Sequence, residues 1–163
     1  MREPDNIAAV SKLSVDYMGF IFHKKSPRYV HEYIDFDAPD NVVRIGVFVN
    51  EKLEKVFEIF DEYLLDGVQL HGQEAPAYLD DLRLLMPHDF IIIKSFAIDD
   101  TFDFSTTETY DGVADYFLFD TKSPQHGGTG IKFDWSLLEN YMGETPFFLE
   151  EAFHQKMLKQ LKP

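Results

Sequence analysis

The sequence contains no cysteine among its 163 residues, which excludes disulfide bonds, thiolate zinc sites and cysteine nucleophiles. It also lacks any apolar run of the ~18 residues that a membrane-spanning helix requires, and its first residues do not resemble a signal peptide. Positive charge is scarce, because 15 Lys and Arg stand against 29 Asp and Glu, giving a net charge of −14. Such a chain would repel the phosphates of nucleic acids and of anionic membranes. We therefore expect no nucleic-acid partner, no membrane association and a cytoplasmic location.

Apolar side chains, by contrast, are abundant. They make up 45% of the chain, and phenylalanine alone occurs 16 times. This is enough to build a packed interior, so general disorder is not expected. The length suits one domain, and we treat residues 1–163 as a single domain.

Short apolar runs alternate with amphipathic stretches along the chain. The runs predict six strands, at residues 16–22, 42–49, 67–70, 90–96, 116–119 and 146–149. The amphipathic stretches predict a helix that begins near Pro4 and others at 50–64, 74–85, 134–141 and 150–161. In the helix at 50–64, Asn50 is the expected N-cap, and the expected apolar face consists of Leu53, Val56, Phe57, Phe60 and Leu64. Residues 31–41 are expected to form a loop, and residues 99–111 fit no element well.

The alternation of strands and helices predicts an α/β fold of parallel strands joined by right-handed crossovers. Proteins of this kind carry their chemistry in the loops that follow the carboxyl ends of the strands. Three such loops contain side chains suited to binding or catalysis.

The loop after the first predicted strand gathers cations in an acidic protein. It reads His23-Lys24-Lys25-Ser26-Pro27-Arg28-Tyr29. The Ser-Pro pair restricts the backbone, and the planar guanidinium of Arg28 can grip a carboxylate at two points. The loop is interpreted either as an anion site or as a solvated basic surface, and the spacing alone favours the surface.

The third predicted strand ends in Gln69-Leu70-His71-Gly72. A histidine at a strand end can act in catalysis, or it can cap the sheet through hydrogen bonds. Taken alone, the pattern favours the structural role of His71.

Asp120 directly follows the fifth predicted strand, and a Gly-rich stretch, Gly127-Gly128-Thr129-Gly130, comes after it. A carboxylate that leaves a buried strand can have a raised pKa and serve as a proton donor. The backbone N–H groups of a Gly-rich loop can face an anion. The alternative is an N-cap aspartate together with an ordinary long loop.

Together these segments resemble the phosphoribosylanthranilate isomerase family of tryptophan biosynthesis, in family order and with family-like spacing up to Leu149. The segments that match are residues 19–22, 25–30, 46–51, 68–72 with Glu74, 120–124, 127–130 and 133–138. The resemblance implies a TIM-barrel-type (β/α) fold of parallel strands.

The resemblance also implies an activity, an Amadori rearrangement of a phosphoribosyl anthranilate aminoaldose to an aminoketose, without cofactor or metal ion. Asp120 matches the general acid that protonates the ring oxygen, and Arg28 matches the arginine that holds the anthranilate carboxylate. Gln69 and His71 are signature positions at the barrel mouth, and Gly128 and Gly130 belong to its Gly-rich loop. Asp120 is thus the expected catalytic residue. The expected substrate-binding residues are Arg28, Gln69, His71, Gly128 and Gly130, and the expected partner is a small phosphorylated sugar-anthranilate.

The sequence departs from the family at three places. The family's general base is a cysteine that ends the first strand, and Met1-Arg2-Glu3-Pro4 matches the residues just after it. Glu150-Glu151 replace a Ser-Gly-Gly of the phosphate site, where two carboxylates would repel a phosphate. No segment matches the eighth strand. We therefore expect about six of eight strands, in a sheet that is open or completed by homo-oligomerisation, and impaired catalysis, because loss of a general base costs about 10²–10⁴ in rate.

Two other functions compete with an impaired isomerase. One is a non-catalytic remnant that binds an anthranilate-like or phosphate ligand through Arg28. The other is an unrelated flavodoxin-like module, which would have an open, doubly wound sheet with helices on both faces.

Overall fold

The computed structural model describes residues 2–13, 15–31, 42–87, 89–121 and 135–150. Its centre is one sheet of six parallel strands, and each strand pairs with the next one in chain order. The strands are β1 (Tyr17–Ile21), β2 (Val43–Phe48), β3 (Gly67–Leu70), β4 (Ile91–Ile98), β5 (Tyr116–Thr121) and β6 (Phe147–Glu150). All six predicted strands are confirmed, and their ends differ from the predicted ends by no more than two residues.

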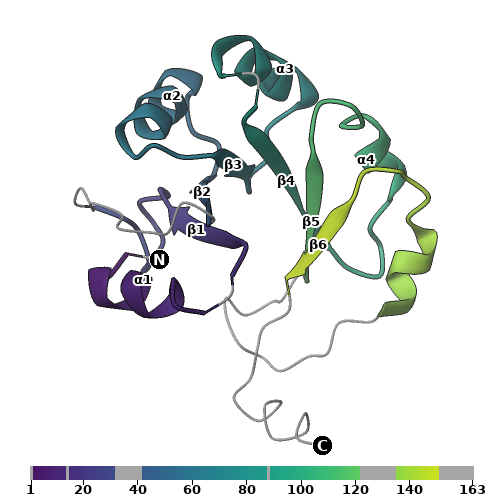
Figure 1. Ribbon diagram of the computed structural model, residues 1–163. Helices are drawn as coiled ribbons and strands as arrows, with labels where there is room; N and C mark the ends of the chain where they lie inside the picture. The colour runs from purple at the N-terminus through teal and green to yellow at the C-terminus, as the bar shows by residue number, and fades with distance from the viewer. Residues whose placement is uncertain (1, 14, 32–41, 88, 122–134, 151–163) are drawn as a thin grey trace, which may run out of the picture.

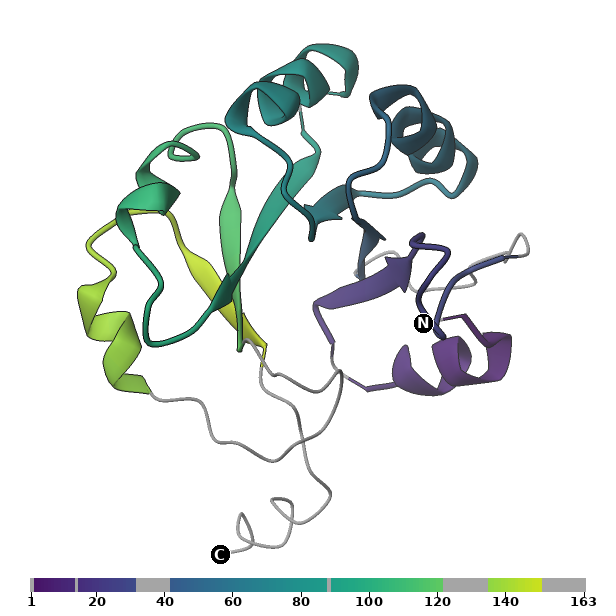
Figure 2. The same cartoon turned by 180° about the vertical axis from the view of Figure 1, so that it is seen from behind.

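The sheet curls, and the helices lie around its outer side (Figures 1 and 2). The α-helices are α1 (Pro4–Val10), α2 (Leu53–Glu62), α3 (Pro76–Leu85) and α4 (Ser105–Glu108), and Trp135–Asn140 forms a 3₁₀ helix, η1. Among the described residues no helix has the length and apolar character needed to cross a membrane. The architecture is that of a barrel lacking part of its circumference, because β1 and β6 each have one strand neighbour in the described sheet.

The strictly sequential strand order contradicts the flavodoxin-like alternative. A doubly wound sheet reverses its strand order at a switch point and carries helices on both faces. Here the order runs β1 to β6 without reversal, and the helices occupy one face.

The strand register decides which side chains point into the barrel. Gln69 pairs with Ile93, and Ala97 pairs with Asp120. Paired residues of a parallel sheet share a face, as do residues two apart on one strand. Gln69, Ser95 and Asp120 therefore project from the inner face, whereas Lys94 projects from the outer face toward the helices.

The outer face carries the main hydrophobic core. Phe20, Phe48, Val68, Leu70, Ile92, Phe117 and Phe119 are fully buried there beneath the helices. Around Phe96, aromatic rings continue through Phe102, Phe104 and Tyr141 with centroid separations of 5.0–6.2 Å. The abundance of phenylalanine thus reflects one large core between sheet and helices.

Two arginine–aspartate pairs fasten the amino ends of the strands. Asp66 accepts hydrogen bonds from the backbone N–H of Arg44 at 2.8 Å and from its Nε at 3.0 Å. Asp115 pairs with Arg83 and accepts the backbone N–H of Ile92 at 2.7 Å. Both aspartates precede a strand, so each pair ties the start of one strand to its neighbour.

The predicted N-cap of the second helix is wrong. Helix α2 begins at Leu53 with Lys52 as its N-cap, and Asn50 has a φ of 49°. Asparagine tolerates this left-handed conformation better than most residues do. Its side-chain Oδ1 instead accepts the backbone N–H of Gln73 at 2.7 Å, so Asn50 joins two loops.

The predicted apolar face of the same helix is partly wrong. Val56 and Phe60 are buried, together with Ile59 and Tyr63, but Phe57 is 45% exposed and Leu64 is 65% exposed. Leu64 has a φ of 48° and lies just past the helix end, the position where a left-handed residue stops a helix. This conformation turns its side chain away from the core.

Other predicted elements differ or lie outside the described residues. The segment predicted as an α-helix at 134–141 forms the shorter 3₁₀ helix η1, whose tighter winding suits one or two turns. Part of the unassigned segment 99–111 forms α4. The predicted loop at 31–41, apart from residue 31, and the predicted helix at 150–161, apart from residue 150, lie outside the described residues.

Candidate functional site

The structure places the candidate residues at the carboxyl ends of the parallel strands. Arg28 lies in the loop after β1, His71 directly follows β3, and Asp120 lies near the end of β5. Because all six strands run the same way, these three positions belong to one rim of the sheet. A site shared by Arg28 and Asp120 needs this arrangement.

Asp120 and His71 lie side by side at this rim. The distance from His71 Nε2 to Asp120 Oδ2 is 3.7 Å, and the side chains are 33% and 34% exposed. Half-burial leaves both accessible to a small molecule while weakening the screening of their charges by water. The pair therefore brings an acid and an imidazole to one spot, as proton transfer requires.

Gln69 connects this pair to the barrel interior. Its side-chain Nε2 is 2.9 Å from His71 Nδ1 and 3.1 Å from Ser95 Oγ. Ser95 lies on β4 and is only 7% exposed. The ring of His71 is thus held from the side opposite Asp120, as its structural interpretation requires, and its functional interpretation stays a prediction.

Arg28 is exposed at the same rim. Its backbone N–H donates to Ser26 Oγ at 3.2 Å, and an isolated bridge between Ile21 and Tyr29 folds the loop back along the end of β1. The structure thus brings Gln69, His71 and Asp120 together, while Arg28 stands on the loop after β1. The predicted residues Gly128 and Gly130 lie outside the described residues.

Glu150 adds a second carboxylate to the inner face of the rim. It pairs with Asp120 in the register of β5 and β6, so the two residues share a face. Glu150 is exposed. Negative charge therefore accumulates at the position where, by the family resemblance, Glu150 replaces part of a phosphate site.

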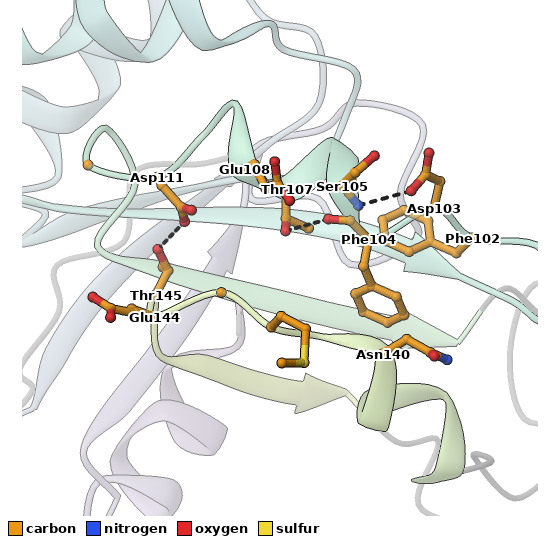
Figure 3. Close-up of a pocket in the computed structure, with 13 residues that line it drawn as sticks. Phe102, Asp103, Phe104, Ser105, Thr107, Glu108, Asp111, Asn140, Glu144 and Thr145 are labelled. Carbon is orange, nitrogen blue, oxygen red and sulfur yellow. Dashed lines mark hydrogen bonds between the residues drawn. The ribbon is translucent and has the colours of Figure 1, made fainter.

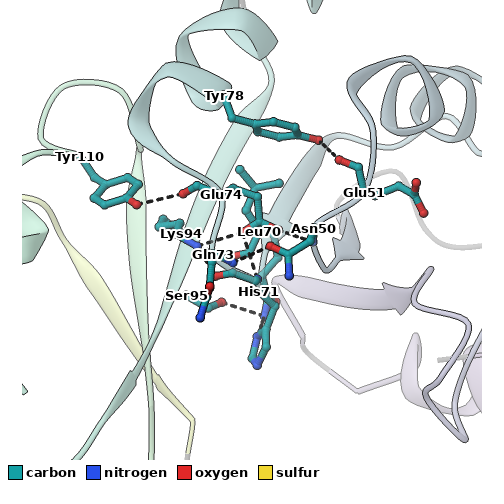
Figure 4. A network of polar contacts seen from close by, with 12 residues as sticks. Asn50, Glu51, Leu70, His71, Gln73, Glu74, Tyr78, Lys94, Ser95 and Tyr110 are labelled. Carbon is teal, nitrogen blue, oxygen red and sulfur yellow. Dashed lines mark hydrogen bonds and ion pairs between the residues drawn. The ribbon is translucent and has the colours of Figure 1, made fainter.

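A buried ion pair supports the loop that carries His71 (Figure 4). Glu74 Oε2 lies 2.9 Å from Lys94 Nζ, and both side chains are at most 3% exposed. The Glu74 carboxylate also accepts the backbone N–H of Asn50 at 2.7 Å and of Gly72 at 3.0 Å. We call Glu74, Lys94, Asn50 and Gly72 the clamp.

The clamp satisfies its charges completely. Lys94 Nζ also donates to the carbonyl oxygen of Gly72 at 2.8 Å, and the backbone carbonyl of Glu74 accepts the hydroxyl of Tyr110 at 2.9 Å. Burial lowers the pKa of Lys94, and the Glu74 carboxylate opposes that shift. A buried charge with this many partners fixes the loop from Gly72 to Glu74 against β4 and the loop after β2.

A hollow of about 860 Å³ lies elsewhere, between residues 102–112 and 140–145 (Figure 3). Half of its polar side chains are acidic, and two of these form hydrogen bonds with other residues of the lining. Asp111 accepts the Thr145 hydroxyl at 2.6 Å, and Asp103 accepts the Ser105 backbone N–H at 3.0 Å. None of the candidate residues at the rim lines this hollow, so the rim remains the candidate site.

Comparison with known proteins identifies the family. Residues 1–150 match the model of the family described as N-(5'-phosphoribosyl)anthranilate isomerase. The chain belongs to this family.

Individual relatives and a solved structure agree with this assignment. The chain is 43% identical to the N-(5'-phosphoribosyl)anthranilate isomerase of Parabacteroides distasonis, over 91% of this chain and 68% of that protein. It is also 43% identical to the isomerase of Phocaeicola vulgatus, over 99% of this chain and 77% of that protein. The crystal structure of phosphoribosyl anthranilate isomerase from Thermotoga maritima superposes with a TM-score of 0.75 at 28% identity, covering 98% of this chain and 78% of that one. The TIM-barrel-type fold expected from the resemblance is confirmed.

Three residues of the site were missed at the level of sequence. Ser95 and Lys94 interrupt the apolar run of β4. The sequence places Glu74 in a segment that resembles the family and predicts it to lie in a helix, which in fact begins at Pro76. A charge inside an apolar strand requires a partner, so Lys94 carried a signal that could have been used. Nothing in the sequence identified Glu74 as that partner.

Proposed function

We propose that this chain supplies the proton donor and the substrate-binding groups of the isomerase reaction at the rim formed by β1, β3 and β5. The observation that carries the proposal is the placement of His71 beside Asp120, 3.7 Å apart, at the strand ends where (β/α) barrels hold their chemistry. The chain's membership in the isomerase family defines the substrate class, a phosphorylated sugar joined to anthranilate.

In this proposal Asp120 donates a proton to the ring oxygen of the sugar as the bond from that oxygen to C1 breaks. The carboxylate left on Asp120 then faces the imidazole of His71. Arg28 holds the anthranilate carboxylate through its guanidinium, which is exposed on the same rim. Gln69 and His71 line the site, and Gly128 and Gly130 are proposed to contact the substrate as well.

We propose further that catalysis by these 163 residues is slow. The base that removes the C2 proton is a cysteine in the family, and the chain contains none. Glu150 lies on the inner face beside Asp120, where its charge opposes a bound phosphate. The homo-oligomeric state and the cytoplasmic location stay predictions.

The experiment is an assay of substrate fluorescence loss with the 163-residue chain, its Asp120→Asn variant and, as control, Asp80→Asn on the exposed side of α3. We expect weak turnover that falls by about 10²–10⁴ in Asp120→Asn and is unchanged in Asp80→Asn. Turnover at the usual rate of the family would refute the impairment. Equal turnover in the two variants would refute the role of Asp120.

The non-catalytic remnant is the second candidate, favoured by the exposed guanidinium of Arg28 in a chain that has no cysteine base. It predicts binding of a product analogue without turnover, measured by calorimetry. Arg28→Ala should weaken that binding at least tenfold, whereas Lys55→Ala on α2 should not change it, because Lys55 lies at an exposed pair with Glu58. If the chain neither binds the analogue nor turns over substrate, both functions are refuted.

A further inference from the structure

We propose that Gln69, anchored by Ser95, fixes the tautomer of His71 so that its Nε2–H points at Asp120. Ser95 is then a positioning residue for the proton donor, and Gln69 has this positioning role in addition to lining the site. The inference deepens the proposed function and rests on it for its catalytic meaning, but its structural content can be tested without substrate.

The chemistry of the amide decides the direction of the hydrogen bonds. The nitrogen of a glutamine side chain carries two N–H donors and accepts none. Gln69 Nε2 is 3.1 Å from Ser95 Oγ and 2.9 Å from His71 Nδ1. One N–H therefore goes to the serine hydroxyl oxygen and the other to the ring nitrogen.

A ring nitrogen that accepts a hydrogen bond cannot hold the proton of a neutral imidazole. The proton must then reside on Nε2, because one nitrogen donates and the other accepts. Nε2 is the atom that faces Asp120, with Oδ2 at 3.7 Å. The carboxylate that Asp120 becomes after donating its proton thus meets an N–H dipole of favourable sign.

The surrounding backbone keeps these groups in place. The backbone N–H of His71 donates to the carbonyl oxygen of Phe48 at 2.8 Å, and the clamp holds Gly72 and Glu74 directly after it. Ser95 is anchored on β4 and is almost fully buried. The amide of Gln69 links Ser95 to the ring of His71, which faces Asp120.

The test is nuclear magnetic resonance of the ring nitrogens in ¹⁵N-labelled protein, at a pH where the rings are neutral. Correlation to the carbon-bound ring protons shows which nitrogen carries the proton. We expect His71 to be Nε2–H, with a narrower tautomer distribution than exposed His31 in the same spectrum. In Gln69→Glu the carboxylate can only accept, so the proton should move to Nδ1 and the two nitrogen shifts should exchange.

Three further variants separate positioning from general effects. Gln73→Glu adds the same charge at the same sequence distance from His71 but on an exposed residue, and it should leave the tautomer unchanged. Ser95→Ala should bring the ring shifts toward those of His31, and Ser95→Thr, which retains a hydroxyl, should restore them.

Two results would overturn the proposal. One is a wild-type His71 protonated on Nδ1, which would mean that the amide turns its oxygen to the ring. The other is an unchanged tautomer in both Gln69→Glu and Ser95→Ala. Because no substrate is present, a correct tautomer in a chain without isomerase activity or analogue binding would count against the proposed function alone.

Discussion

Replacing Lys94 with methionine tests whether the clamp holds the loop that carries His71. Methionine keeps most of the side-chain volume and removes the charge. Glu74, 2% exposed at its side chain, would keep the backbone donors of Asn50 and Gly72 but lose its counter-ion. The carbonyl oxygens of Leu70 and Gly72 would also lose a donor.

The magnitude follows from the burial of the pair. At a separation of 2.9 Å and an effective dielectric constant of about 20, the gross attraction is roughly 6 kcal/mol. Desolvation of two buried ions offsets much of it, so the net contribution of the intact pair is small. Removal of one partner is different, because the desolvation of the other is no longer compensated. We expect Lys94→Met to lower the free energy of unfolding by about 3–5 kcal/mol.

The measurement is urea unfolding followed by circular dichroism. Lys55→Met is the matched control, since Lys55 and Glu58 are also 2.9 Å apart but 50% and 62% exposed. We expect no measurable loss of stability in the control. In the double variant Lys94→Met with Glu74→Gln, the loss should be smaller than the sum of the two single losses, by about 1–3 kcal/mol. Equal midpoints for Lys94→Met, Lys55→Met and the wild type would refute the reasoning.

Two further outcomes follow from the same region. Gly72→Ala places a Cβ 2.5 Å from Asn50 Oδ1 and 2.7 Å from Glu74 Oε1, so it should lower the free energy of unfolding in urea by about 1–3 kcal/mol. Gly19→Ala is the control and should cost less, because its nearest atom lies at 3.7 Å. A larger loss in Gly19→Ala would contradict the close approach at Gly72. Burial raises the pKa of Tyr78 and Tyr110. Above pH ~10 the folded chain therefore retains protons that the unfolded chain has lost. The contribution of these tyrosines to the free energy of unfolding should be fully present below that pH and fall above it. Tyr78→Phe should make this alkaline fall less steep in unfolding curves measured across pH; an equally steep fall would show that other groups cause it.

The strands could be predicted because their residues carry the signal locally. Runs such as residues 42–49 are β-branched and apolar, since parallel strands buried on both faces need such residues. The rim positions of Arg28, His71 and Asp120 followed from the general rule that chemistry lies after the carboxyl ends of such strands. The family resemblance then implied roles for Arg28 and Asp120 and left that of His71 open, and the structure adds that His71 and Asp120 are neighbours.

The clamp and the hydrogen bonds of Gln69 could not be predicted, because they depend on contacts between segments far apart in sequence. Glu74 and Lys94 are 20 residues apart, and Gln69 and Ser95 are 26 apart. Asn50 shows how a prediction from residue type alone can fail. Its residue type is that of an N-cap, yet its side chain bonds across to Gln73 and the helix begins three residues later.

Different contacts order the amino ends and the carboxyl ends of the strands in this open sheet. At the amino end, Tyr17 of β1 lies edge-on to Phe148 of β6 and Tyr116 of β5, with ring centroids 5.3 and 6.5 Å apart. These rings join the first and last strands across the inner face, where no described backbone hydrogen bonds do so. They add side-chain contacts between β1 and β6 to a sheet whose carboxyl ends share one rim because its strands are parallel. At the carboxyl end, the clamp fixes Gly72 and Glu74 directly after His71, and His71 lies 3.7 Å from Asp120.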